Sequence, residues 1–156
     1  MRESLKYIMN DNIISIIDYG MGNARSVRNA LKNMNVESII EKNPKNLNKS
    51  SAIILPGVGS FKQAVKNLIQ IGFFKEIDKL VQNEKIPFLG ICLGMQLIAQ
   101  DSTENELTKG FGWINAKVRK IDLDQKYKLP HVGWNQIEKK KNSILMTRIE
   151  NHTNYY

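Results

Sequence analysis

The chain has 156 residues, 42% hydrophobic and 24% charged, a composition typical of one globular domain with a sizeable core. A single cysteine excludes an intrachain disulfide scaffold. No apolar run is long enough for a transmembrane helix or a signal-peptide core, so we expect a cytoplasmic protein. The net charge of +8 comes from lysines scattered among asparagines. The one run of consecutive lysines, residues 139–141, has no aromatic residues interleaved with it. We therefore expect the chain to bind neither nucleic acid nor a membrane.

The amino-terminal part predicts a strand, a glycine turn and a helix. Residues 1–11 show no periodicity and are predicted to form an extension, with Met9 as an alternative start. The β-branched run Ile13–Ile17 is typical of a central parallel strand, and apolar spacing predicts a helix over residues 24–33. Such a unit can bind phosphate, but Gly20-x-Gly22 lacks the third glycine of the dinucleotide fingerprint. We therefore expect only a ligand or partner contact in this loop.

Two more strands are predicted, at residues 36–40 and 52–55, with a polar connection over residues 43–50 between them. The second strand ends in Pro56-Gly57-Val58-Gly59, a turn whose backbone amides can face a cavity. If this strand lies beside the one that leads to Cys92, Gly57 and Val58 can form part of an oxyanion hole. A plain glycine-rich turn is the alternative.

Two helices are predicted to follow that turn. Ser60 can cap a helix over residues 61–69, and Gly72 separates it from a second helix over residues 73–83. The second helix leads the chain to the next strand.

That strand carries the most informative stretch of the chain. Residues 86–91 look like a strand buried on both faces, and Gly-x-Cys-x-Gly then leads into a helix that we expect to reach about Gln100. This is the pattern of a nucleophile elbow, which holds Cys92 with strained dihedrals beyond the end of the sheet. A helix N-terminus behind Cys92 favours the thiolate, and the amide of Leu93 can face a developing oxyanion. The alternative is that Cys92 is a small buried hydrophobic residue.

The chain after Cys92 is less informative. We expect Met95, Leu97 and Ile98 to be core residues, whereas the amide of Gln96 can face either a pocket or solvent. Residues 101–109 are predicted to be a loop, residues 110–121 a strand or hairpin arm, residues 129–135 a further strand and residues 143–149 a weak helix or turn.

His131 lies in the last predicted strand, with Trp134 on the alternate face. An imidazole suits general-base chemistry near neutral pH, and pairing His131 with Cys92 is one hypothesis. A structural or interface role is the other, and the sequence favours it.

Four strings carry a resemblance to a known family over almost the whole chain. They are Ile17-Asp18-Tyr19-Gly20-Met21-Gly22-Asn23, Leu55-Pro56-Gly57-Val58-Gly59, Gly90-Ile91-Cys92-Leu93-Gly94-Met95-Gln96 and Leu129-Pro130-His131-Val132-Gly133-Trp134-Asn135. Together they resemble the class I (triad) glutamine amidotransferases, and within them the glutaminase subunits of imidazole glycerol phosphate synthase, an enzyme of histidine biosynthesis.

The resemblance implies a fold and a set of roles. The fold is a three-layer, flavodoxin-like α/β domain with a mostly parallel sheet, covering residues 12–156. Cys92 would be the nucleophile, Gly57, Val58 and Leu93 would line the oxyanion side, and Gln96 would help to seat the substrate glutamine. The implied site needs no metal and no organic cofactor. Asn23, His131, Gly133 and Trp134 would face a (β/α)₈-barrel cyclase partner in a heterodimer.

One departure from the family limits these expectations. The family continues past the Tyr-Tyr stretch, with further strands and a His-Pro-Glu motif that supplies the general base and its orienting carboxylate. Neither His131 nor His152 is followed by such a motif, so we expect the C-terminal strands to be missing and glutamine turnover to be negligible. Two alternatives to the histidine pathway stay open: the same chemistry feeding amination of a surface sugar, and a truncated, non-catalytic binding subunit.

Overall fold

A computed structural model describes residues 13–122, 129–141 and 143–156. The predicted extension over residues 1–11 and the alternative start at Met9 lie outside these residues. The chain divides into two compact units, residues 1–120 and residues 121–156, which are described separately. None of the helices in the described part of the chain has both the length and the apolar character needed to cross a bilayer.

Unit 1 is built on a four-stranded parallel sheet with the strand order β2-β1-β3-β4. The strands are β1 (Ile14–Ile17), β2 (Ser38–Glu41), β3 (Ala52–Gly57) and β4 (Phe88–Cys92). The apolar runs that predicted strands therefore do form them, and the prediction of an α/β fold with a mostly parallel sheet is confirmed. β3 extends two residues further than predicted, because Pro56 and Gly57 still pair with β4.

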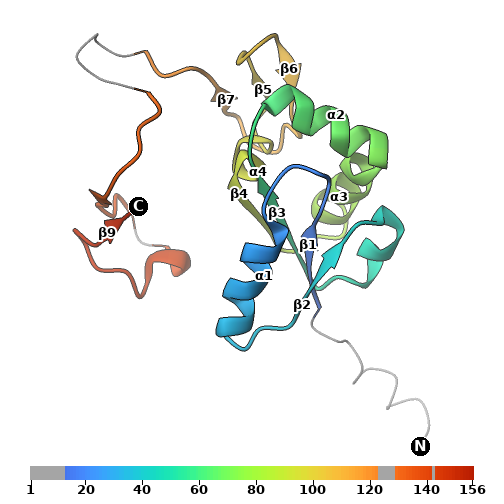
Figure 1. Ribbon diagram of the computed structural model, residues 1–156, viewed down its shortest axis with the longest axis horizontal. Coiled ribbons are helices and arrows are strands. Elements are labelled where there is room, and N and C mark those ends of the chain that lie inside the picture. The colour runs from blue at the N-terminus through green and yellow to red at the C-terminus, as the bar shows by residue number, and fades with distance from the viewer. Residues whose placement is uncertain (1–12, 123–128, 142) are drawn as a thin grey trace, which may run out of the picture. The chain divides into compact units, whose positions relative to one another are not determined.

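Helices cover both faces of this sheet, giving three layers (Figure 1). On one face, α1 (Ala24–Asn33) packs Ala24, Val27 and Leu31 against Ile16 and Ile54.

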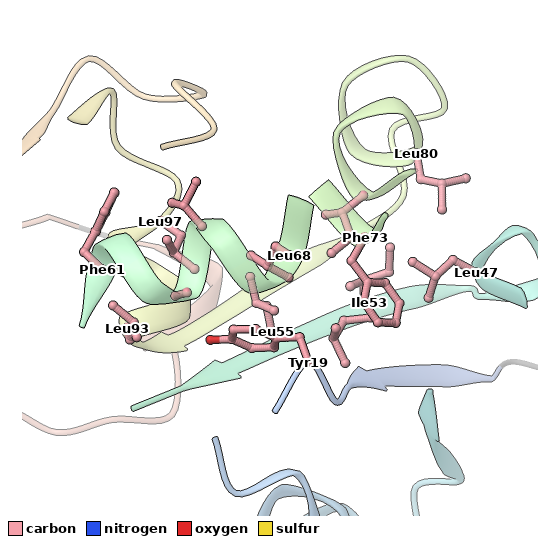
Figure 2. Close-up of a cluster of buried hydrophobic side chains, with 14 residues drawn as sticks. Tyr19, Leu47, Ile53, Leu55, Phe61, Leu68, Phe73, Leu80, Leu93 and Leu97 are labelled. Carbon is pink, nitrogen blue, oxygen red and sulfur yellow. The ribbon is translucent and has the colours of Figure 1, made fainter. Parts of the chain in front are cut away.

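The other face carries the larger core, beneath α2 (Phe61–Ile71) and α3 (Phe73–Gln82) (Figure 2). Gly72, with φ of +95°, lies between these two helices and separates them as predicted. The polar connection between β2 and β3 contains a 3₁₀ helix, η1 (Pro44–Lys49), whose Leu47 joins this core.

β4 is not buried on both faces as predicted. It lies at the end of the strand order in the described sheet. Ile16, Ile54 and Leu89 form one row across the sheet, and their exposed fractions are 0%, 6% and 52%. The reason is that the residues of α1 pack against Ile16 and Ile54, in β1 and β3, rather than against β4. Ile91, two residues further along β4, is also exposed.

The helix after Cys92 is shorter than predicted. α4 spans only Leu93–Gln96. The carbonyl oxygens of Leu97 and Ile98 accept hydrogen bonds from the amides of Phe111 (2.8 Å) and Trp113 (3.0 Å), so they are not used for further helical turns. Leu97 is buried as predicted and Ile98 is half-buried, whereas Met95 is exposed and is not a core residue.

Residues 101–118 form a small sheet rather than the predicted loop and long strand. Its strands are β5 (Asp101–Ser102), β6 (Thr108–Lys109) and β7 (Lys117–Val118), in the order β6-β5-β7. The apolar residues between β6 and β7 serve the core instead: the Phe111 ring stacks on Phe74, and Trp113 Nε1 donates to Asp78 Oδ1 over 2.7 Å.

Unit 2 contains a short antiparallel pair, β8 (Asn135–Gln136) and β9 (Asn154–Tyr155). A 3₁₀ turn, η2 (Ile144–Met146), lies between them where a weak helix or turn was predicted. The strand predicted over residues 129–135 is wrong for all but its last residue, because pairing with β9 begins only at Asn135.

Candidate active site

Cys92 lies at the point where β4 ends and α4 begins, as the elbow pattern predicts. Its backbone has φ of +54° and ψ of −112°, a region that non-glycine residues rarely adopt. The residue is exposed. A strained backbone with an exposed thiol is the geometry expected of a nucleophile and excludes the alternative of a small buried core residue.

Two glycines make this turn sterically possible. A β-carbon at Gly90 would lie 2.6 Å from the carbonyl carbon and oxygen of Gly94. A β-carbon at Gly94 would overlap the carbonyl oxygen of Leu55 in β3. The small residues two before and two after Cys92 are therefore required by close backbone packing.

Gly57 is the partner of Cys92 across the β3–β4 pair. It is buried, and a β-carbon there would lie 2.9 Å from Cβ of Leu93 and 3.0 Å from the amide nitrogen of Gly94. Val58 follows β3 and is exposed. Because Leu93 is the first residue of α4, its amide is among those that have no partner inside the helix. The structure thus brings the predicted oxyanion segments, Gly57–Val58 and Leu93, beside Cys92.

The loop after β1 packs against the same place. A β-carbon at Gly22 would lie 3.2 Å from the carbonyl group of Pro56, and one at Gly59 would lie 3.2 Å from Cε of Met21. Three of the four strings that carry the resemblance therefore meet at the carboxyl ends of β1, β3 and β4. Ligands of parallel α/β sheets bind at that edge.

Two further predicted site residues of unit 1 are Gln96, in α4, and Asn23, at the start of α1. Gln96 is half-buried and is the last residue of α4. Asn23 caps α1, its Oδ1 accepting from the amide of Ser26 over 3.0 Å. This capping contact does not test whether Asn23 also contacts a partner protein, so the interface role of Asn23 stays a prediction.

The fourth string belongs to unit 2. His131 Nε2 and Asn135 Nδ2 form a hydrogen bond of 2.6 Å. Trp134 is exposed, its ring packing edge-on against Tyr156 with centroids 5.7 Å apart, and Gly133 precedes it. Because these residues and Cys92 lie in different units, the structure does not test a pairing of His131 with Cys92.

Two contacts of unit 1 were not predicted from the sequence. Glu104, not Ser60, caps α2: its Oε2 accepts from the amide of Phe61 over 2.8 Å, whereas the Ser60 side chain makes no cap hydrogen bond. The chain gives no local signal for a contact between residues so far apart. Tyr19 is the second, since its buried hydroxyl lies beside Gly57.

Burial, and then the negative charge of Cys92, raise the pKa of Tyr19 to about 12. No cluster of three or more metal-ligating side chains occurs among the described residues. A cavity of about 610 Å³ lies at the opposite end of the sheet, lined by residues such as Ile13, Val36 and Ser38, and is too far along the strands to serve Cys92.

Comparison with known proteins gives one consistent picture. The chain matches the family described as glutamine amidotransferase class-I over residues 15–155, which span both units. It is 44% identical over 145 residues to imidazole glycerol phosphate synthase subunit HisH 2 of Methanococcus maripaludis, covering 92% of this chain and 71% of that protein. It is 42% identical over 144 residues to subunit HisH 1 of Campylobacter jejuni, covering 92% of this chain and 72% of that protein.

A solved structure of a glutamine amidotransferase matches the fold with a TM-score of 0.59 at 23% identity, over 68% of this chain and 55% of that one. The parallel sheet, the strained Cys92 at the elbow and the family match over residues 15–155 agree. The chain belongs to the class-I glutamine amidotransferase family.

Proposed function

We propose that this chain is the glutaminase subunit of an imidazole glycerol phosphate synthase. In this reaction the thiolate of Cys92 attacks the side-chain amide carbon of glutamine and forms a tetrahedral oxyanion. The carbon–nitrogen bond then breaks, the nitrogen takes up a proton and leaves as ammonia, and a γ-glutamyl thioester remains on Cys92. Water hydrolyses the thioester to glutamate and restores the thiol.

The observation that carries the proposal is the juxtaposition of Cys92 and Gly57. Cys92 is exposed and strained at the elbow, and Gly57 lies directly opposite in β3. A carbonyl attacked by the sulfur would place its oxygen near the amides of Leu93 and of the Gly57–Val58 segment, where backbone donors stabilise an oxyanion. Gln96 of α4 would contact the substrate glutamine.

The partner is proposed from the relatives. Their names call them subunits of imidazole glycerol phosphate synthase, which supports a heterodimer with a (β/α)₈-barrel cyclase that consumes the ammonia in histidine biosynthesis. Asn23, His131, Gly133 and Trp134 are the proposed contacts. No specific observation favours amination of a surface sugar. We place the reaction in the cytoplasm, which fits a chain with one unpaired cysteine.

The general base is the part of the reaction that unit 1 does not supply. Both histidines of the chain lie in unit 2, where His131 is followed by Val-Gly and His152 by Thr-Asn. A thiol without an oriented base typically loses about four orders of magnitude in turnover. Loss of the base should cost a comparable factor, and alanine variants of His131 and His152 would show whether either histidine is that base.

Occupancy of the site by glutamine is tested without turnover. Iodoacetamide should alkylate Cys92 in the folded chain, and excess glutamine should slow that reaction whereas the same concentration of asparagine should not. Cys92→Ser is the control that removes the labelled atom. Equal protection by both amino acids, or by neither, would contradict the proposed substrate.

A further inference from the structure

The hydroxyl group of Tyr19 is buried without a hydrogen-bond partner among the described residues. Tyr19 follows β1, is 1% exposed, and its carbonyl oxygen accepts from Asn67 Nδ2 over 3.2 Å. The backbone is thus held in place while the phenol oxygen contacts neither solvent nor an acceptor. Buried polar atoms are rarely left so, and an exception in an otherwise well-packed core calls for a physical reason.

The Tyr19 hydroxyl lies where β3 meets α4. A β-carbon at Gly57 would lie 2.6 Å from the Tyr19 oxygen and 2.9 Å from Cβ of Leu93, so the oxygen lies against Gly57 and close to the first turn of α4. Figure 2 shows the Tyr19 ring within the core with its oxygen directed towards Leu93. Since Gly57 is the strand partner of Cys92, the hydroxyl lies against one backbone segment of the proposed oxyanion hole and close to the other.

The phenol keeps its proton here and can therefore act as a hydrogen-bond donor. Its pKa is raised to about 12, first by burial and then by the charge of Cys92, so it remains protonated at every pH at which a cysteine ionises within the neutral range. Asp18, the other acidic group at the end of β1, accepts from the amide of Gly20 and pairs with Lys42 over 3.5 Å. After burial, the charge of Cys92 is the second cause of the raised pKa of Tyr19.

We propose that Tyr19 is a positioning residue of this site, whose hydroxyl dipole stabilises the thiolate of Cys92 and fixes the backbone of Gly57 beside it. The inference rests on the proposed role of Cys92 as the nucleophile. The hydroxyl has no hydrogen-bond partner among the described residues, and ionisation of the sulfur provides an anion towards which its dipole can orient. The interaction is thus stronger in the ionised state, which is the state that attacks the substrate.

The test is the pH dependence of Cys92 alkylation in the full chain, measured from about pH 5.5 to about pH 9, the range in which thiols ionise. Tyr19→Phe keeps the ring and removes the hydroxyl. We expect its rate–pH curve to move about one unit towards higher pH, so that the alkylation rate on the rising part of the curve falls about tenfold. The thermal unfolding midpoint at neutral pH should not fall, because the hydroxyl it removes has no partner. Tyr155→Phe, which removes a phenol from unit 2, should leave the curve unchanged.

A second variant keeps the test decisive if the first one does not fold. Site-specific replacement of Tyr19 by 3-fluorotyrosine retains the shape and makes the hydroxyl a stronger donor, so it should move the curve towards lower pH. A core-packing role for Tyr19 would not produce shifts in opposite directions. A curve unchanged in whichever of the two variants folds would overturn the role of Tyr19 and leave the proposed function standing. An unreactive Cys92 in the unsubstituted folded chain would instead overturn the proposed function, and this inference with it.

Discussion

Gly94 lies against Leu55, so closely that no side chain could be placed between the first turn of α4 and the backbone of β3. A β-carbon at Gly94 would overlap the carbonyl oxygen of Leu55 and approach its carbonyl carbon to 2.8 Å. The contact seats α4 directly on β3 and thereby fixes the position of the Leu93 amide relative to Gly57. The glycine two residues after Cys92 is therefore part of the geometry of the proposed oxyanion hole.

Gly94→Ala should lower the free energy of unfolding by about 3 kcal/mol or more, since the overlapped atom is backbone and cannot move without separating α4 from β3. Urea denaturation measures the change. Gly112→Ala is the control: nothing lies within 4 Å of a β-carbon there, and only its φ of +71° disfavours a side chain. That strain should cost about 1 kcal/mol. Equal losses in the two variants would show that the Gly94 contact is not as tight as described.

The stability of the fold should fall at high pH through Tyr19. Its pKa is raised from 10.0 to about 12 in the folded chain, so between these values the unfolded chain loses the phenol proton while the folded chain keeps it. The folded state then binds more protons, and stability decreases as pH rises. The difference is on the order of 2 kcal/mol for a group this deeply buried.

The measurement is the free energy of unfolding from about pH 9 to about pH 12, a range that spans the ordinary pKa of tyrosine. Lysines and the other tyrosines titrate in the same range, so the relevant quantity is the difference between the unsubstituted chain and Tyr19→Phe. That difference should favour the phenylalanine variant increasingly as pH rises through this interval. A difference that does not depend on pH would contradict the burial of an ionisable phenol.

Trp134→Ala should weaken binding of the cyclase partner by about 2 kcal/mol or more, because a large aromatic side chain is a typical interface anchor. Its 72% exposure means that the substitution should hardly change folding. Titration calorimetry with the cyclase measures the affinity. Leu107→Ala removes a similarly exposed apolar side chain, 70% exposed, from unit 1 and is the matched control. Identical affinities for Trp134→Ala and the unsubstituted chain would remove Trp134 from the proposed interface.

The sequence predicts the parts of the fold that depend on local pattern. The β-branched run at Ile14–Ile17 and the helical spacing of Val27 and Leu31 set β1 and α1, and the bounds of α1 agree with the prediction. The elbow at Cys92 is predictable for the same reason, because its glycines, its thiol and its apolar strand are adjacent in the chain. Gly90 packs against Gly94 within this stretch, whereas the need for glycine at position 94 comes from Leu55 in β3.

The features of the fold and site that the sequence did not predict depend on residues that meet only in the folded chain. α4 ends early because the amides of Phe111 and Trp113 bond to the carbonyl groups of Leu97 and Ile98, which no periodicity of residues 93–100 reveals. The exposure of Leu89 depends on which element covers β4, and an apolar run is the same whether its strand is central or at an edge. Tyr19 likewise reads as an ordinary turn residue until the fold brings its hydroxyl to Gly57.

The identity of the nucleophile is tested most directly by a glutamine-analogue electrophile, such as a diazoketone, followed by peptide mass mapping. The folded chain at neutral pH should gain one adduct, on Cys92, at a rate well above that of free cysteine, because the analogue is held beside the strained thiol. Cys92→Ser should gain none. Labelling of Cys92 that requires denaturant, or that proceeds no faster than with free cysteine, would contradict the assignment of Cys92 as the nucleophile of a glutamine site.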